Sequence, residues 1–135
     1  MSSSWAKMSV KISANSLSAR ELSRQIGGTP ARSVEVGQPV SPRSASVHVQ
    51  AFCIYESPIS SESTPDEHIA WAISFLESIQ GPLSTIHPKP EIDLRLGLSS
   101  TEQCCLALTA TELSFLGAQG AQINFDVYPS ESESE

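Results

Sequence analysis

The sequence predicts an α+β fold, in which helices pack on one face of a single layer of mixed, mostly antiparallel sheet. The expected order of elements is β-α-β-α-β-β-α-β. Three observations favour this class: five segments alternate apolar and polar residues, three segments begin with a helix-capping sequence, and each predicted strand keeps one mostly polar face. A length of 135 residues suits one domain.

Alternating polarity marks the strands. They are expected at residues 8–14, 47–55, 92–98, 104–108 and 123–127. In the first of them, Met8, Val10 and Ile12 share one face, and Ser9 and Lys11 share the other. Because the polar faces are nearly free of large apolar residues, we expect helices to cover only the opposite face of the sheet.

Capping sequences mark the helices. The strongest is Thr64-Pro65-Asp66-Glu67, in which Thr64 and Glu67 form a capping box and Pro65 occupies the first helical position. This helix places an apolar stripe on one side and is expected to stop at Gly81-Pro82. Two shorter helices are expected to begin at the capping boxes of Ser18 and Thr109, and to stop near glycines. Those glycines are Gly27 and Gly117.

The two shorter helices resemble each other in sequence. Leu17–Ser23 and Leu108–Ser114 are identical at five of seven positions. Two interpretations stay open: capping boxes look alike, or the chain contains a duplicated strand–helix–strand half of ferredoxin-like type.

Polar segments delimit the domain. Residues 1–7 are expected to form a flexible leader, residues 8–129 the single domain, and residues 130–135 a disordered acidic tail of Ser and Glu. Gly27–Ser46, which contains three prolines, is expected to be a long irregular connection.

Charge limits the partners that the protein could take. Eight basic residues oppose 15 acidic ones, which leaves a formal net charge of −7. Nucleic acid and anionic membrane both need a basic surface, so neither is expected as a partner. The charge is uneven, with a net +4 up to Ala45 and a net −11 beyond it. This asymmetry serves either attraction of a basic protein or solubility.

The expected location is the cytoplasm. Three cysteines cannot form a fully paired disulfide framework, and no apolar run approaches the roughly 18–20 residues of a membrane span. The first residues also lack the apolar centre of a signal peptide.

Several short motifs together resemble a known family. They are the Leu17–Ile26 helix with Gly28-x-Pro30 and Gly37-x-Pro39 after it, Glu67-His68-Ile69, Leu113–Gly120, and the closing Ile123–Tyr128 segment with Asp126-x-Tyr128. In these motifs the chain is similar, from Ser9 to Tyr128, to the domain of unknown function 4279 family of small bacterial proteins. The family often has a Trp in its second strand, where this chain offers Phe52. The resemblance implies no catalytic residues, and an immunity or accessory role only by analogy.

No catalytic or metal-binding arrangement stands out. His48, His68 and His87 are far apart and form no metal-binding pair. His68 is either an acid–base residue or a half-exposed residue of the first helical turn. Cys104 and Cys105 point to opposite faces of their predicted strand, so they do not converge on one metal. We expect no cofactor, no metal site and no catalytic residue.

The polar strand positions form the candidate binding site. Six side chains should project from the uncovered face of the sheet, and Tyr128 or Phe52 should add apolar contact. The six are Lys11, His48, Asp93, Arg95, Asn124 and Asp126. The alternative is an ordinary solvated face with cross-strand charge pairs.

Three hypotheses for function follow. The first is a small non-enzymatic binding or accessory protein, such as an immunity-type inhibitor, that acts through protein–protein contacts with a basic partner. The second is a small-ligand-binding protein or enzyme with a cleft between the polar sheet face and the Gly27–Ser46 connection, where His48, Arg95 and Asp126 converge. The third is a homodimer formed through an exposed edge strand.

Overall fold

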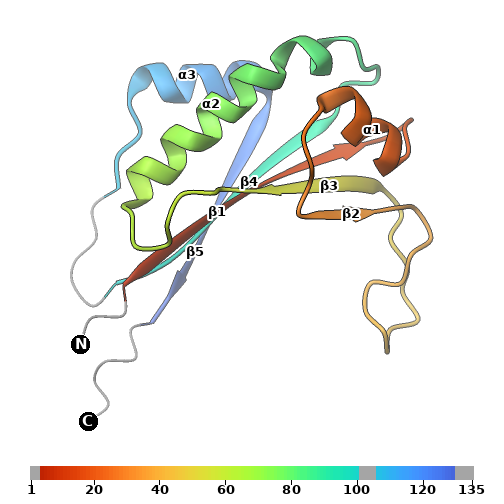
Figure 1. The fold of residues 1–135 in the computed structure, drawn as a ribbon, viewed down its shortest axis with the longest axis horizontal. Helices are drawn as coiled ribbons and strands as arrows, with labels where there is room; N and C mark the ends of the chain where they lie inside the picture. Colours follow the sequence, from red (N-terminus) through yellow and green to blue (C-terminus); the bar gives the residue numbers. More distant parts are fainter. Residues whose placement is uncertain (1–3, 101–105, 130–135) are drawn as a thin grey trace.

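Five strands form one sheet in the computed structural model, which describes residues 4–100 and 106–129 (Figure 1). The strands are β1 (Trp5–Ala14), β2 (Arg32–Val34), β3 (Ala51–Glu56), β4 (Glu91–Ser99) and β5 (Ala121–Tyr128). Their spatial order is β2-β3-β1-β4-β5. The β4–β5 pair is parallel and the other pairs are antiparallel. The expected α+β class with a mixed, mostly antiparallel sheet is therefore confirmed.

Three helices lie on one face of this sheet (Figure 1). They are α1 (Ala19–Ile26), α2 (Pro65–Ser84) and α3 (Ala110–Gln119). Helix α2 packs against β1 and β4, α1 packs against β3, and α3 packs against β5. The core lies between these layers, where Val10, Ile12, Leu94, Leu96 and Leu76 are almost completely buried. No helix of the described residues is long and apolar enough to cross a membrane.

All three predicted capping boxes are present. Ser18, Thr64 and Thr109 each accept a hydrogen bond from the backbone three residues later, and the glutamates at those positions bond back. Two helix ends were predicted too early. Helix α2 continues through Pro82 because Leu83, which is 5% exposed, packs in the core. Helix α3 continues through Gly117 and ends at Gly120, which adopts a left-handed φ of 68°.

The structure places two strands differently from the prediction. A short strand, β2, lies inside the Gly27–Ser46 segment that we expected to be irregular. The second predicted strand begins at Ala51 instead of Val47, because β1 ends at Ala14, opposite Ala51, and offers residues 47–50 no partner. The fourth predicted strand covered residues 104–108. Residues 106–108 form no strand in the structure, and Cys104 and Cys105 lie outside the described residues.

The first strand starts earlier than expected. Trp5, Ala6 and Lys7 pair with Ser99, Leu98 and Gly97 of β4, so they belong to the sheet. Residues 1–3 of the expected leader and the whole expected tail, 130–135, lie outside the described residues.

The two similar helices sit in different surroundings. Helix α1 connects β1 to β2, which runs parallel to β1 but is separated from it by β3, whereas α3 connects β4 to its parallel neighbour β5. The two segments therefore share a capping box and a preceding strand, but they do not share a strand pairing.

Candidate functional site

The uncovered face of the sheet carries the polar strand residues. Pairing aligns Lys11 with Asp93 and Ser9 with Arg95, while Asn124 lies beside Arg95 on the next strand. Since the buried residues of β1 and β4 occupy the alternate positions, all of these side chains share the face opposite the helices. The predicted residues that share this face are Lys11, Asp93, Arg95, Asn124, Asp126 and Tyr128.

His48 lies elsewhere, and its expected position on a strand was wrong. It belongs to the connection before β3, and its ring contacts that of Phe52 with centroids 5.4 Å apart. The ammonium group of Lys11 lies 4.2 Å from the centroid of the same Phe52 ring. Phe52 is 6% exposed, so the connection covers this end of the sheet face. His48 is therefore separated from Arg95 and Asp126, and the cleft expected beside the connection does not unite the three.

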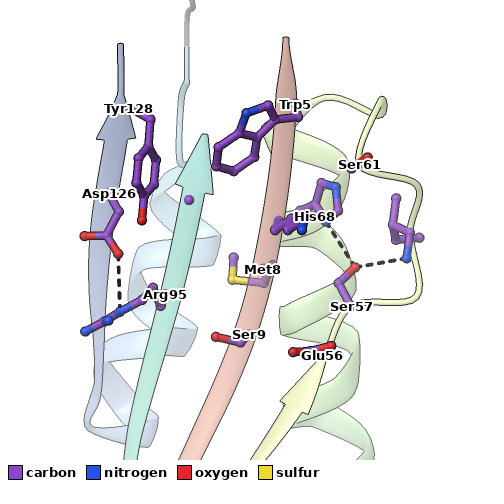
Figure 2. A pocket seen from close by; sticks show the side chains of 13 residues that line it. Trp5, Met8, Ser9, Glu56, Ser57, Ser61, His68, Arg95, Asp126 and Tyr128 are labelled. Atoms are coloured by element: carbon purple, nitrogen blue, oxygen red, sulfur yellow. Dashed lines mark hydrogen bonds and ion pairs between the residues drawn. The ribbon is translucent and has the colours of Figure 1, made fainter. Parts of the chain in front are cut away.

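A hollow lies at the other end of the uncovered face (Figure 2). Its volume is about 510 Å³. Strands β1, β4 and β5 form its floor, and the loop after β3 forms one side. We call it the Trp5–Tyr128 hollow, and it is lined by Trp5, Lys7, Met8, Ser9, Glu56, Ser57, Ile59, Ser61, His68, Arg95, Gly97, Asp126 and Tyr128.

Two aromatic rings meet over a glycine in this hollow. The ring centroids of Trp5 and Tyr128 are 5.3 Å apart with a tilt of 42°. Strand β4 runs between the two rings in Figure 2, and its residue Gly97 pairs with Lys7 of β1 and Asp126 of β5. A Cβ atom at Gly97 would lie 3.5 Å from the Trp5 ring and 3.7 Å from the Tyr128 ring. The missing side chain allows both rings to pack closely over the backbone of β4.

An ion pair stands next to the aromatic rings. The Nε atom of Arg95 lies 3.5 Å from a carboxylate oxygen of Asp126, and this is the only ion pair between side chains in the described ranges. The Arg95 side chain is 65% exposed, so its guanidinium retains donors for a ligand. Lys7 and Glu56 are also exposed and line the same hollow. Two acidic and two basic side chains thus line the hollow that holds the aromatic pair.

A buried histidine forms the polar corner of the hollow. His68 is 1% exposed, which corrects the expectation of a half-exposed residue. Its Nε2 lies 3.0 Å from the carbonyl oxygen of Ser60, and its Nδ1 lies 3.1 Å from the hydroxyl of Ser57. A carbonyl oxygen only accepts, so Nε2 carries a proton, and in the neutral form of the ring Nδ1 accepts from the Ser57 hydroxyl. The Ser57 oxygen in turn accepts from the Ile59 amide, so these bonds tie the loop to α2.

The groups with shifted pKa values lie in the core, away from the hollow. Burial raises the pKa of the Cys53 thiol, which donates to the carbonyl oxygen of Ala19 at 3.3 Å. Burial also raises the pKa of Tyr55 to about 12. Within residues 4–100 and 106–129, no three His, Cys, Asp or Glu side chains are grouped so that they could hold a metal ion.

Of the residues that line the hollow, sequence reasoning predicted only Arg95, Asp126 and Tyr128 as site residues. Trp5 and Lys7 were assigned to a leader, although the alternation of Ala6, Met8 and Val10 against Trp5, Lys7 and Ser9 already extends the strand back to Trp5. No sequence signal marks Glu56, Ser57 or Gly97, because they join the site only through strand pairing.

Fold and site define a small α+β protein with a one-sided sheet and a polar-aromatic hollow on its uncovered face. The chain belongs to the family described as domain of unknown function (DUF4279), whose model matches residues 4–130. No curated protein and no solved structure matches the chain.

Proposed function

We propose that this protein is a non-enzymatic binding protein that acts through protein–protein contacts, with the Trp5–Tyr128 hollow as its contact site. The observation that carries the proposal is the Trp5–Tyr128 ring pair beside the exposed Arg95. Trp, Tyr and Arg dominate the binding energy of protein interfaces, because they combine a large apolar area with a directed polar group. Here the three residue types gather in one concave site.

A basic side chain of the partner fits this site. The face of an indole or phenol ring attracts a cation, Asp126 provides a carboxylate next to Tyr128, and Glu56 provides a second one at the opposite end of the hollow. The net charge of −7 attracts a basic partner over a longer range. Lys7 and Arg95 oppose a second cation, so they restrict how the partner is oriented. An immunity-type inhibitor of a basic protein is one form of this function.

The first test is capture of the partner from the source organism with immobilised protein at low and moderate salt. Glu56→Lys should abolish capture of any protein that the wild type retains in stoichiometric amount. Glu77→Lys is the matched control, because Glu77 is exposed on α2 and the variant has the same net charge. Lys7→Glu should retain the partner at higher salt than the wild type. Equal capture by the Glu56→Lys and Glu77→Lys variants would refute a basic partner in the hollow.

A second test uses the shape of the hollow. An added Cβ at Gly97 meets only ordinary van der Waals contacts, so Gly97→Ala should fold and still bind the captured partner. Gly97→Val should fold but bind at least about tenfold more weakly, because its methyl groups displace the two rings that pack over Gly97. Binding by calorimetry with the captured partner measures the difference. Equal affinity of the valine and alanine variants would place the contact outside the hollow.

The second candidate function is that of a small-ligand-binding protein or enzyme, and it is favoured by the Ser57–His68 pair. In its neutral form His68 accepts from the Ser57 hydroxyl at the wall of the hollow, as a general base does for a nucleophile. A fluorophosphonate probe, which labels nucleophilic serines, tests the enzymatic form of this function. Ser57→Ala should lose the label, and the control variant Ser60→Ala should keep it. The absence of labelling in the wild-type protein would remove the enzymatic form of this candidate.

A further inference from the structure

The two edges of the sheet differ in how they are protected. At one edge, β2 is only three residues long and begins with Arg32. At the other edge, β5 is eight residues long, contains no proline and carries a single charge, on Asp126. Among the described strands, only β4 pairs with β5. Proteins usually blunt a free edge with short strands, prolines or lysines, and β5 has none of these.

Apolar side chains along β5 are also exposed. Ile123, Phe125 and Val127 alternate on the side of the sheet that faces the helices. Phe125 is 42% exposed and Val127 is 72% exposed. An unpaired backbone edge next to exposed apolar side chains is the feature that strand addition would cover.

We propose that a second copy of this chain adds its β5 antiparallel to the free edge of β5 and forms a dimer with one continuous sheet. A closed two-fold dimer through one strand pairs that strand with itself, and such pairing is antiparallel. A two-fold axis perpendicular to the sheet keeps the helices of both subunits on the same face. Residues of the uncovered face then pair with residues of the uncovered face, and apolar residues pair with apolar residues.

Charge and apolar pattern select the register. An axis through Asp126 would place two carboxylates opposite each other, which is unfavourable. An axis through Phe125 places Asp126 opposite Asn124 of the partner subunit, whose amide group can donate to the carboxylate. The same register places Val127 opposite Ile123 of the partner subunit, so the exposed apolar row continues across the dimer. The dimer then extends the floor of each Trp5–Tyr128 hollow.

Sedimentation equilibrium over a hundredfold range of concentration tests the dimer. The wild type should approach the mass of two chains as the concentration rises, and Val127→Lys should weaken dimerisation at least about tenfold, because a charged edge resists pairing. Val49→Lys is the matched control: Val49 is 87% exposed and lies in the connection before β3. Circular dichroism should show that both variants are folded. A wild type that is monomeric throughout, or equal dissociation constants for the two variants, would overturn the proposal.

The register has its own test. Asn124→Asp should weaken the dimer, because it places two carboxylates opposite each other, whereas Asn124→Lys should keep or strengthen it by pairing with Asp126 of the partner subunit. An equal effect of both variants would contradict the axis through Phe125. The Glu56→Lys and Lys7→Glu variants should leave the dimer unchanged, so failure of the hollow as a binding site and failure of the dimer are separate outcomes.

Discussion

At the level of single residues, Tyr55 has a buried ring and an unsatisfied hydroxyl. The ring is 5% exposed and lies 5.0 Å from the ring of Phe75, while the hydroxyl has no hydrogen-bond partner among the described residues. We expect Tyr55→Phe to leave the free energy of unfolding unchanged or to raise it by about 1 kcal/mol, because a buried unpaired hydroxyl destabilises the folded state. Urea unfolding measures the change. Tyr128→Phe, at an exposed tyrosine, is the control, and a loss of stability specific to Tyr55→Phe would reveal a partner for the hydroxyl.

The same residue makes stability depend on pH in alkaline solution. Burial raises the pKa of Tyr55 from 10.0 to about 12, so the unfolded chain releases this proton at a lower pH than the folded chain. Release from the unfolded state favours unfolding, and the free energy of unfolding should therefore fall as the pH rises from 10 towards 12. The buried Cys53 thiol, whose pKa is also raised, adds to the fall from about pH 9.

Variants separate the two contributions to this pH dependence. The free energy of unfolding should be measured with urea at pH 8, 9.5 and 11. Compared with the wild type, Tyr55→Phe should lose less of it above pH 10, and Cys53→Ala should lose less of it near pH 9. A wild-type stability that stays constant from pH 8 to 11 would contradict both assignments.

Two histidines, His68 and His48, show which structural features the sequence patterns did not determine. The position of His68 in the first turn of α2 was predictable from the capping box, but its burial was not. Its ring is covered because Ser57 and Ser60, from a loop eight or more residues earlier, supply both hydrogen-bond partners. His48 followed an alternating pattern, yet its backbone pairs with Gly37 and Gln38 of the connection and not with a strand of the sheet.

At the level of elements, the caps of α2 and α3 should differ in their effect on the whole protein. Thr64→Ala should lower the free energy of unfolding by about 1 kcal/mol, because it removes a cap from the helix that spans the core. Thr109→Ala should instead speed amide hydrogen exchange within α3, since Leu116 is the only buried residue of that helix. Ser74→Ala, at an exposed position within α2, is the control and should be neutral or slightly stabilising. Equal loss of global stability from both cap variants would contradict this difference.

Faces of strands were more predictable than their ends. The alternation of Met8, Val10 and Ile12 with Ser9 and Lys11 placed Lys11 correctly on the uncovered face, because side chains of a strand alternate with a period of two. The beginning of β3 could not be predicted in the same way. Val47 and Val49 continue the alternation, but β1 ends opposite Ala51, and Val47 forms an isolated bridge with Pro39 instead of joining the sheet.

At the level of the whole molecule, the fold class was predictable and the hollow was not. Capping boxes and alternation are local patterns, and they indicated an α+β protein with one polar sheet face. The hollow requires that Trp5, Gly97 and Tyr128 meet, and they meet only because β4 lies between β1 and β5. That strand order depends on how the core packs, which no short segment determines.

The molecule as a whole is acidic, whereas the charges in the hollow are balanced. The chain carries a net charge of −7, whereas the hollow balances Glu56 and Asp126 against Lys7 and Arg95. Composition therefore indicates the sign of the charge on a partner that is attracted over a long range. The charged residues of the hollow decide how that partner is oriented.

The most direct measurement is the fluorescence of Trp5 during titration with the captured partner. The chain has two tryptophans, so Trp71→Phe leaves Trp5 as the single reporter within the hollow. Burial of the hollow should shift the Trp5 emission to shorter wavelength and saturate at one partner per chain, while a Trp5→Phe variant that reports from Trp71 on α2 should show no shift. Saturable binding that leaves the Trp5 emission unchanged would contradict the hollow as the contact site.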